Sequence, residues 1–377
     1  MSQKKKVVII GSAYPLRGGG ISTFNERLAK AFLDRGDDVI IYTFSLQYPS
    51  FLFPGSTQYS TEQPPENLNI KVKISSINPF TWIKTAFEIR RFNPEIAVVR
   101  FWIPFMAPCL GTISRIIRLK GKTRVIAITD NIIPHERRIG DSKLVQYFVN
   151  SVDGFIAMSR SVLADLNMFD KLKPKAYHHH PIYDNFGDSI SKEDAKAKLK
   201  LSLSARYILF FGFIREYKGL DLLLEAFSSK RLKAMNLKLL VAGEFYGNEE
   251  KYLSLIKKFN LEDYIELKTS FIPNNEVYLY FCASDLVVQP YKNATQSGVT
   301  QIAYHFCKPM ITTDVGGLSE VIPDGKVGYV VQPEVGAIEN AIYKFYSESR
   351  EKEFIENVKT ERDRFSWSGL LDLIDKL

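Results

Sequence analysis

The segment YILFFGFIREYKGLDLLLEAF, residues 207–227, carries the unit on which the fold prediction rests. A run of large apolar residues ends at Gly212, and Arg215 and Lys218 follow before an amphipathic helix pattern. An apolar run without alternation is typical of a strand that is buried on both faces, as in a parallel sheet. The segment therefore predicts one strand–loop–helix unit of an α/β protein.

Runs of this kind alternate with helix-length segments along the chain. Helix patterns are clear in STFNERLAKAFLDRG at 22–36 and in GLDLLLEAFSS at 219–229. The candidate strands are KVVIIG, DVIIYTF, IKVKIS, EIAVVRF, RVIAIT and GFIAMS in the first half, and YILFFG, LKLLVAG, IELKTS, DLVVQP, PMITTD and VGYVV in the second. This order predicts two doubly wound α/β domains, whose ligands bind beyond the carboxyl ends of the strands.

A polar and charged segment without a strand pattern separates the two halves. We place the linker at residues 183–200, which gives predicted domains at 1–185 and 200–360. A chain of 377 residues with 45% hydrophobic residues suits two separate cores.

Composition limits the function without choosing it. The net charge of +8 suits a nucleic acid, an anionic membrane surface or a polyanionic substrate. The apolar runs are too short to span a bilayer, and the N-terminal residues lack the apolar core of a signal peptide. Cys109, Cys282 and Cys307 lie far apart in apolar contexts, which predicts buried thiols in a reducing compartment. We expect a cytoplasmic protein.

The loop GSAYPLRGGGIST, residues 11–23, joins the first predicted strand to the first predicted helix. Its glycine triplet permits close backbone approach, and the helix N-terminus supplies N–H groups for a phosphate or a sugar oxygen. The alternative is an ordinary turn with Ser22 or Thr23 as helix cap. The glycine spacing is not G-x-G-x-x-G, so nicotinamide chemistry is disfavoured.

Arg215 and Lys218 follow a predicted core strand at its carboxyl end. Two cations in that place suit a diphosphate, because arginine grips two oxygens and lysine acts as a point charge. The alternative is solvated surface charge without a ligand.

The segment TQSG, residues 295–298, precedes a helix pattern with apolar residues at Val299, Ile302, Ala303 and Phe306. Hydroxyls and backbone N–H groups at a helix N-terminus stabilise negative charge, which favours the phosphates of a nucleotide-linked substrate. An ordinary helix cap at Thr295 or Ser297 explains the pattern equally well.

Asp130, His135 and Glu136 come just after a predicted strand of the first half. They could orient an acceptor hydroxyl or take its proton, or the histidine could be structural. The run HHH at 178–180 lacks the spacing of metal ligands and is interpreted as structure at the edge of the linker.

Taken together, these segments resemble the retaining glycosyltransferases of the two-Rossmann (GT-B) fold, family 4 in the usual classification. The similar segments are PLRGGGISTFNERLAKAFLDRGDDV, GFIREYKGLDLLLEAF and KPMITTDVGGLSEVIPDGKVGYVV, and they cover nearly the whole chain. The resemblance implies two Rossmann-like domains that face each other across a cleft. It also implies that FSWSGLLDLIDKL is part of a C-terminal helix, at 361–377, that crosses back onto the first domain.

The resemblance assigns roles by position, and these join the candidates above. Lys218 is expected to contact the donor diphosphate, and the HE pair to lie on the acceptor side. The complete prediction has an acceptor side with Asp130, His135 and Glu136; a donor diphosphate site with Lys218, Arg215, Gly19, Gly20, Ser297 and Gly298; and a donor sugar and nucleotide site with Thr295, Gln296, Glu244, Phe271, Ile272 and Glu320. No metal site is predicted.

The chain departs from the family pattern at three positions. Ala294 and Ile302 stand where family members usually carry glutamates that touch the sugar and the ribose, and Phe213 stands where they carry an arginine. Arg215 is a candidate to replace that arginine. Loss of catalysis remains an open alternative.

The implied reaction moves a sugar from a UDP- or GDP-linked donor to a hydroxyl of a glycan or lipid-linked oligosaccharide, with retention of configuration, as in surface polysaccharide biosynthesis. An epimerase-type or non-catalytic nucleotide-sugar-binding protein is the alternative, and nucleic-acid binding is disfavoured. Two basic amphipathic segments, 77–92 and 112–124, have two interpretations. They either rest on the anionic inner face of the cell membrane or simply cover the first sheet.

Overall fold

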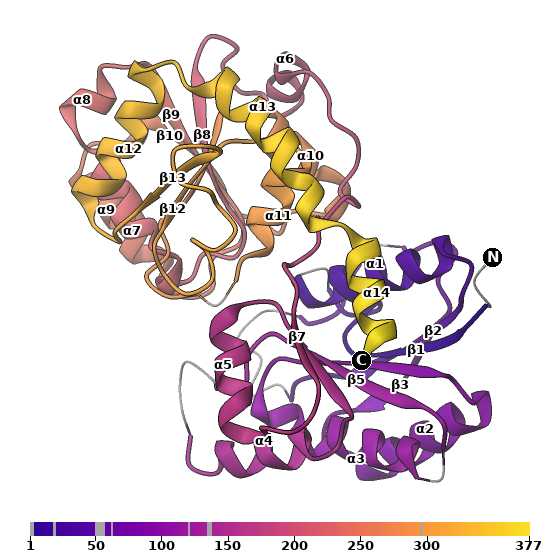
Figure 1. Ribbon diagram of the computed structural model, residues 1–377. Coiled ribbons are helices and arrows are strands. Elements are labelled where there is room, and N and C mark those ends of the chain that lie inside the picture. Colours follow the sequence, from indigo (N-terminus) through magenta and orange to yellow (C-terminus); the bar gives the residue numbers. More distant parts are fainter. Residues whose placement is uncertain are drawn as a thin grey trace. The chain divides into compact units, whose positions relative to one another are not determined.

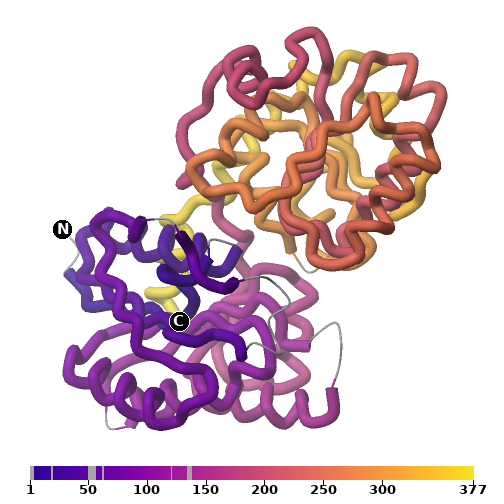
Figure 2. Tube along the Cα trace, turned by 180° about the vertical axis from the view of Figure 1, so that it is seen from behind, coloured from indigo at the N-terminus to yellow at the C-terminus, as the bar shows by residue number. Residues whose placement is uncertain are grey.

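The computed structural model describes residues 4–17, 20–49, 57–61, 63–119, 121–133, 138–294 and 296–377. The chain forms two compact units (Figure 1), unit 1 with Met1–His179 and Ser366–Leu377, and unit 2 with His180–Phe365. Figure 2 shows from behind how the last residues, in yellow, return to unit 1 after unit 2 is complete. Each unit has a parallel sheet and its own apolar core.

Unit 1 contains a seven-stranded sheet in the order β3-β2-β1-β4-β5-β6-β7. Every neighbouring pair is parallel. The central strands are buried on both faces, as their unbroken apolar runs predict. The strands are β1 (Lys6–Ile10), β2 (Asp38–Leu46), β3 (Ile70–Ser75), β4 (Ile96–Phe101), β5 (Arg124–Thr129), β6 (Gly154–Ala157) and β7 (Lys175–Tyr177).

The helices of unit 1 form a layer on each face of this sheet. In Figure 1, α2, α3 and α4 lie together on one side, and α1 lies with α14 on the other. Trp367 at the start of α14 packs on Phe24 of α1 with ring centroids 5.1 Å apart, and Asp375 near its end forms an ion pair with Arg35 at 2.8 Å. The helices are α1 (Gly20–Asp34), α2 (Pro79–Phe92), α3 (Ala107–Arg118), α4 (Asp141–Val149), α5 (Arg160–Phe169) and α14 (Trp367–Lys376).

Unit 2 contains a six-stranded parallel sheet in the order β10-β9-β8-β11-β12-β13. Its strands are β8 (Arg206–Phe211), β9 (Leu237–Ala242), β10 (Ile265–Lys268), β11 (Leu286–Gln289), β12 (Met310–Thr313) and β13 (Gly328–Val331). Its helices are α6 (Lys192–Lys198), α7 (Leu220–Phe227), α8 (Lys230–Lys233), α9 (Glu249–Lys258), α10 (Val277–Ala283), α11 (Gly298–His305), α12 (Val335–Ser347) and α13 (Glu351–Glu361).

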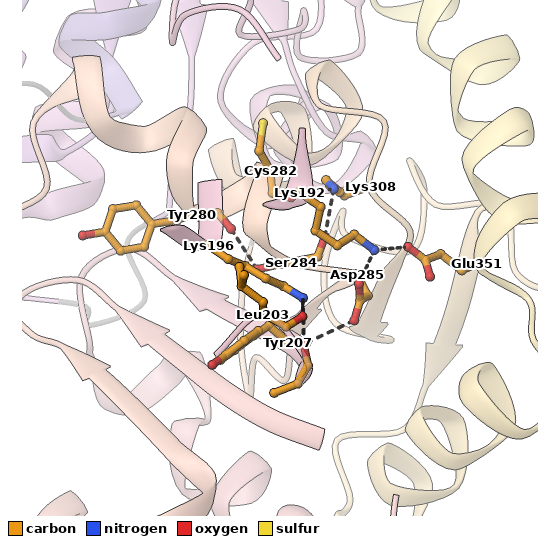
Figure 3. Close-up of polar contacts among 11 residues, drawn as sticks. Lys192, Lys196, Leu203, Tyr207, Tyr280, Cys282, Ser284, Asp285, Lys308 and Glu351 are labelled. Carbon is orange, nitrogen blue, oxygen red and sulfur yellow. Dashed lines mark hydrogen bonds and ion pairs between the residues drawn. The ribbon is translucent and has the colours of Figure 1, made fainter. Parts of the chain in front are cut away.

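A polar network fastens α6 to the amino edge of the second sheet (Figure 3). Lys192 forms ion pairs with Asp285 and, at 2.7 Å, with Glu351. Asp285 also accepts a hydrogen bond from the backbone N–H of Tyr207 at the start of β8, at 3.0 Å. The partly buried Lys308 donates to the carbonyl oxygen of Ser284 at 2.8 Å. Since burial of an unpaired charge is costly, these partners explain how several lysines can lie at this edge.

The predicted strands are all present, and β7 is an addition. Its three residues are only partly buried, so they carry no apolar run that a sequence pattern could reveal. The predicted linker at 183–200 contains α6, which belongs to unit 2. No described helix is both long and apolar enough to cross a membrane.

Two smaller expectations need correction. Cys307 is only partly buried, whereas Cys109 and Cys282 are buried as predicted. Ser22 and Thr23 are not helix caps, because α1 already begins at Gly20. The Ser22 hydroxyl instead donates to the carbonyl oxygen of Arg17 at 3.0 Å.

Candidate functional site

The strand order of unit 2 reverses between β8 and β11, which is the point where doubly wound sheets bind ligands. The loops that follow these two strands therefore leave the same edge of the sheet. Gly219, in the loop after β8, has a φ of +68°, and an added Cβ would lie 1.9 Å from the carbonyl oxygen of Pro290, directly after β11. Only glycine permits this approach, so the two loops are held in contact.

Lys218 lies buried between these loops, with 9% of its surface exposed. An added Cβ at Gly212 would lie 2.9 Å from the Nζ atom of Lys218 and 3.7 Å from Val299 in the first turn of α11. The same Nζ atom lies 5.6 Å from the centre of the Tyr291 ring. The prediction that Lys218 and the start of α11 share one place is therefore consistent with the geometry.

Lys218 forms no ion pair with any described residue. By contrast, Lys292 in the neighbouring loop pairs with Asp221 at 2.6 Å, and Lys251 pairs with Glu216 at 3.0 Å. Burial, and secondarily the nearby Arg215 charge, lowers the pKa of Lys218 to about 7. A buried cation without a counter-charge at a ligand-binding edge is suited to an anionic ligand.

Arg215 is exposed, and its guanidinium stacks on the Tyr246 ring at 4.2 Å. Phe213 packs against the same ring, with centroids 5.3 Å apart. The backbone joins the two loops involved, because Ile214 N–H donates to the carbonyl oxygen of Glu244 at 2.9 Å. Arg215 is thus positioned by an aromatic contact that leaves its N–H groups available for a diphosphate.

Ser297 occupies the cap position of α11, but its side chain makes no cap hydrogen bond. Its hydroxyl instead lies 3.3 Å from the hydroxyl of Tyr291. The ordinary-cap interpretation of Ser297 is therefore wrong. Gly298 begins the helix, and an added Cβ there would lie 3.1 Å from the Tyr183 ring. The first turn of α11 is thus free of a Ser297 cap, as an anion site requires.

Tyr291 was missed by the sequence prediction. It is buried, it lies against Lys218 and Ser297, and burial raises the pKa of its hydroxyl. The segment QPYKNATQSG contained it, but nothing in the pattern distinguished this tyrosine from a core residue. Tyr291 is therefore added to the candidate site, because it contacts both Lys218 and Ser297 at the start of α11.

The two positions at which family members usually carry glutamates hold buried apolar residues in the structure. Ala294 is buried in a small cluster with Tyr291 and Leu318, and Ile302 is buried on α11. No carboxylate therefore stands at either position.

Several other predicted donor-site residues lie in loops after the strands of the same sheet. Gln296 directly precedes the cap of α11, Glu244 follows β9, and Phe271 and Ile272 follow β10. Glu320 is half-buried in a turn after β12. Thr295 lies outside the described residues.

In unit 1, Asp130 directly follows β5 and is buried. Its carboxylate oxygens accept hydrogen bonds from Arg100, one of them from Nε at 2.6 Å. The Arg100 guanidinium also stacks 3.8 Å from the Phe24 ring of α1. This ion pair holds the Asp130 side chain at the carboxyl edge of the first sheet.

The remaining predicted site residues belong to unit 1, with His135 and Glu136 assigned to the acceptor side and Gly19 and Gly20 to the donor diphosphate. His135, Glu136 and Gly19 lie outside the described residues, and Gly20 is the first residue of α1. Over the described ranges, no group of three or more His, Cys, Asp or Glu residues could hold a metal ion.

Two parallel doubly wound sheets, each in its own unit, define the GT-B type of fold. The family "Glycosyl transferases group 1" matches residues 191–361, and "Glycosyltransferase Family 4" matches residues 18–178. The chain belongs to the GT-B glycosyltransferases of group 1.

Among relatives, D-inositol 3-phosphate glycosyltransferase of Corynebacterium urealyticum is 26% identical over 56% of this chain and 51% of its own length. The chain thus matches about half the length of that relative. N-acetyl-alpha-D-glucosaminyl L-malate synthase of Bacillus anthracis is 24% identical over 85% of this chain and 82% of its own. The solved structure of Anabaena Alr3699/HepE in complex with UDP-glucose has a TM-score of 0.72 at 14% identity and covers 99% of this chain and 98% of that chain. This likeness confirms the fold.

Proposed function

We propose that the chain is a retaining glycosyltransferase that moves a hexosyl group from a nucleotide diphosphate sugar, with UDP or GDP, to a hydroxyl group. The acceptor in this proposal is a glycan or a lipid-linked oligosaccharide of surface polysaccharide biosynthesis. Family membership and the names of the two relatives support sugar transfer, and the UDP-glucose complex of the solved neighbour supports the donor class. The observation that carries the proposal is the buried Lys218 without an ion pair at the switch point of the second sheet.

In the reaction, the bond between the anomeric carbon and the diphosphate oxygen breaks, and the acceptor hydroxyl oxygen forms the new bond to that carbon. The hydroxyl proton passes to the leaving diphosphate. Negative charge grows on the leaving diphosphate. The Lys218 ammonium and the N–H groups at the start of α11 stabilise this charge from fixed positions, and Arg215 supplies a second cation. Since these groups balance the leaving charge, the proposal needs no metal ion.

The other predicted residues have proposed roles in binding the donor or the acceptor. Ser297, Gly298, Gly19 and Gly20 hold phosphate oxygens. Thr295 and Gln296 take the place of the missing first glutamate at the sugar. Glu244, Phe271, Ile272 and Glu320 line the nucleotide pocket. His135 and Glu136 face the acceptor, with Asp130 as a positioning residue through Arg100.

Retention of configuration in this proposal results from attack on the same face as the leaving group, without a protein-bound sugar. Positions 294 and 302 carry the apolar residues Ala294 and Ile302, so neither position supplies a carboxylate that could form a covalent sugar intermediate.

The second candidate is a nucleotide-sugar-binding protein that is non-catalytic or an epimerase. The apolar residues at positions 294 and 302 favour it, because they remove two polar contacts with the donor.

The test is a panel of UDP- and GDP-sugars incubated with the protein, with and without candidate acceptors. Transfer predicts free nucleotide diphosphate only when an acceptor is present, and a product whose anomeric configuration by NMR equals that of the donor. An inverted product would contradict the retaining mechanism. Isomerised donor without nucleotide release would identify an epimerase, and binding without turnover would identify a binding protein.

A further inference from the structure

Helix α2 exposes a row of large apolar side chains. Phe80 is 83% exposed, Phe87 is 50% exposed and Ile83 is 43% exposed. Ile77, just before the helix, is 53% exposed. Residues three or four positions apart lie on the same side of a helix, so the three helical residues form one stripe. Single exposed apolar residues are ordinary in proteins, whereas a stripe of this kind calls for a partner.

The opposite side of α2 is fixed in the core of unit 1. Trp82, Ala86 and Ile89 are buried, and the Trp82 indole N–H donates to the carbonyl oxygen of Ser75 at 2.6 Å. The Asn78 side chain caps the helix start. Because these contacts determine the rotation of the helix, the exposed phenylalanines cannot turn inward without breaking them.

Cations share the exposed side with the apolar stripe. Lys84 and Arg91 are exposed there, and neither forms an ion pair with a described residue. Glu88 is the single acidic residue of α2, and it pairs with Lys71 at 2.7 Å. We call Phe80, Ile83, Lys84, Phe87 and Arg91 the α2 outer face. It combines apolar and positively charged groups without an acidic one.

Helix α3, the second basic segment of the sequence prediction, differs from α2. Arg115 donates to the Ser151 hydroxyl at 2.9 Å, and Arg118 forms an ion pair with Asp153 at 2.6 Å. These arginines are engaged within unit 1. The two segments have similar sequence patterns but differ in the structure. The arginines of α3 have partners within unit 1, whereas the exposed cations of α2 form no ion pair with a described residue.

We propose that the α2 outer face docks on the surface of an anionic phospholipid bilayer. Phenylalanine and isoleucine side chains can enter the boundary between headgroups and acyl chains, while Lys84 and Arg91 contact lipid phosphates. A protein partner fits less well, because the centre of a protein interface is depleted of lysine, whereas Lys84 lies within the apolar stripe. The inference extends beyond the proposed sugar transfer and stands without it.

The experiment is sedimentation of the full chain with phosphatidylcholine vesicles that contain or lack phosphatidylglycerol. The wild type should bind vesicles with phosphatidylglycerol, and added salt should weaken binding. The F80S/F87S variant should have a partition coefficient at least about tenfold lower, since each change removes a large apolar contact. The K84E/R91E variant should lose binding to the same extent.

Charge-matched and apolar control variants are available on other exposed surfaces. K257E/K258E makes the same change in net charge on α9 of unit 2, and L203S removes another exposed apolar side chain. Both should bind like the wild type, and thermal melts should show that every variant is folded.

Equal binding of F80S/F87S and the wild type would overturn the proposal, as would equal loss in K257E/K258E, which would indicate non-specific charge attraction. A wild-type protein that does not bind vesicles would also overturn the proposal. In that case, self-association of the wild type that is lost in F80S/F87S would identify the α2 outer face as a protein interface. Sugar transfer to a short soluble acceptor, measured on the same variants, reports separately on the proposed function.

Discussion

The two edges of the second sheet differ in how their lysines are partnered. At the amino edge, Lys192 pairs with Asp285 and Glu351, and Lys308 donates to a backbone carbonyl (Figure 3). At the carboxyl edge, Lys218 is more enclosed than either of them and forms no ion pair with a described residue. A lysine with an ion-pair or hydrogen-bond partner inside the fold stabilises the structure. An enclosed lysine without one marks a place where the counter-charge arrives with a ligand.

The Lys218→Met variant tests this comparison with the largest expected effect. Methionine keeps the length of the side chain and removes the charge, so kcat/KM for sugar transfer should fall by about a thousandfold, as when one stabilising donor is lost from a transition state. Thermal stability should not fall, because an unpaired buried charge is removed. Initial-rate kinetics and a thermal melt measure both.

Lys308→Met is the control, a partly buried lysine of the same unit that donates to a backbone carbonyl at the other edge. It should lower the melting temperature and leave donor affinity unchanged. If both variants lost activity equally, the distinction between the edges would fail.

Asp285→Ala tests the amino edge. The change removes the partner of Lys192 and the acceptor for the Tyr207 N–H, so unfolding free energy should fall by about 3 kcal/mol, as when a buried ion pair loses one member. Urea unfolding measures the loss, and calorimetry should show unchanged UDP binding. A stable variant with weakened UDP binding would contradict the structural role.

The pH dependence of donor binding gives the smallest expected effect. Burial lowers the pKa of Lys218 to about 7, so the free protein loses this charge as the pH rises through that value. Since the protonated form attracts the diphosphate, affinity for a nucleotide diphosphate sugar should be about tenfold weaker at pH 8 than at pH 6. Calorimetry at both values measures this.

Lys218→Arg should flatten this pH dependence, because arginine stays charged throughout the range. Equal wild-type affinity at pH 6 and pH 8 would show that the charge of Lys218 does not couple to donor binding.

Much of the fold was predictable because its signals are local. The unbroken apolar runs that became β1, β4, β8 and β11 identify strands of a parallel sheet without reference to any distant residue. The short and partly buried β7 carried no such signal and was missed.

The candidate site was predictable in outline. Lys218 and Ser297 could be found from their places after a strand and before a helix. Tyr291 could not, since its contacts with both depend on how two loops meet. The pairing of Asp130 with Arg100 was hidden for the same reason, because the partners lie on neighbouring strands and are separated in sequence.

The sequence by itself determined the order of strands and helices, the two-unit architecture and the family resemblance, since each rests on patterns within short segments. Only the tertiary structure decided which cations have partners. It enclosed Lys218 without a counter-charge, engaged the arginines of α3 and left Lys84 and Arg91 exposed. The physical reason is that an ion pair depends on atoms that folding brings together from distant parts of the chain.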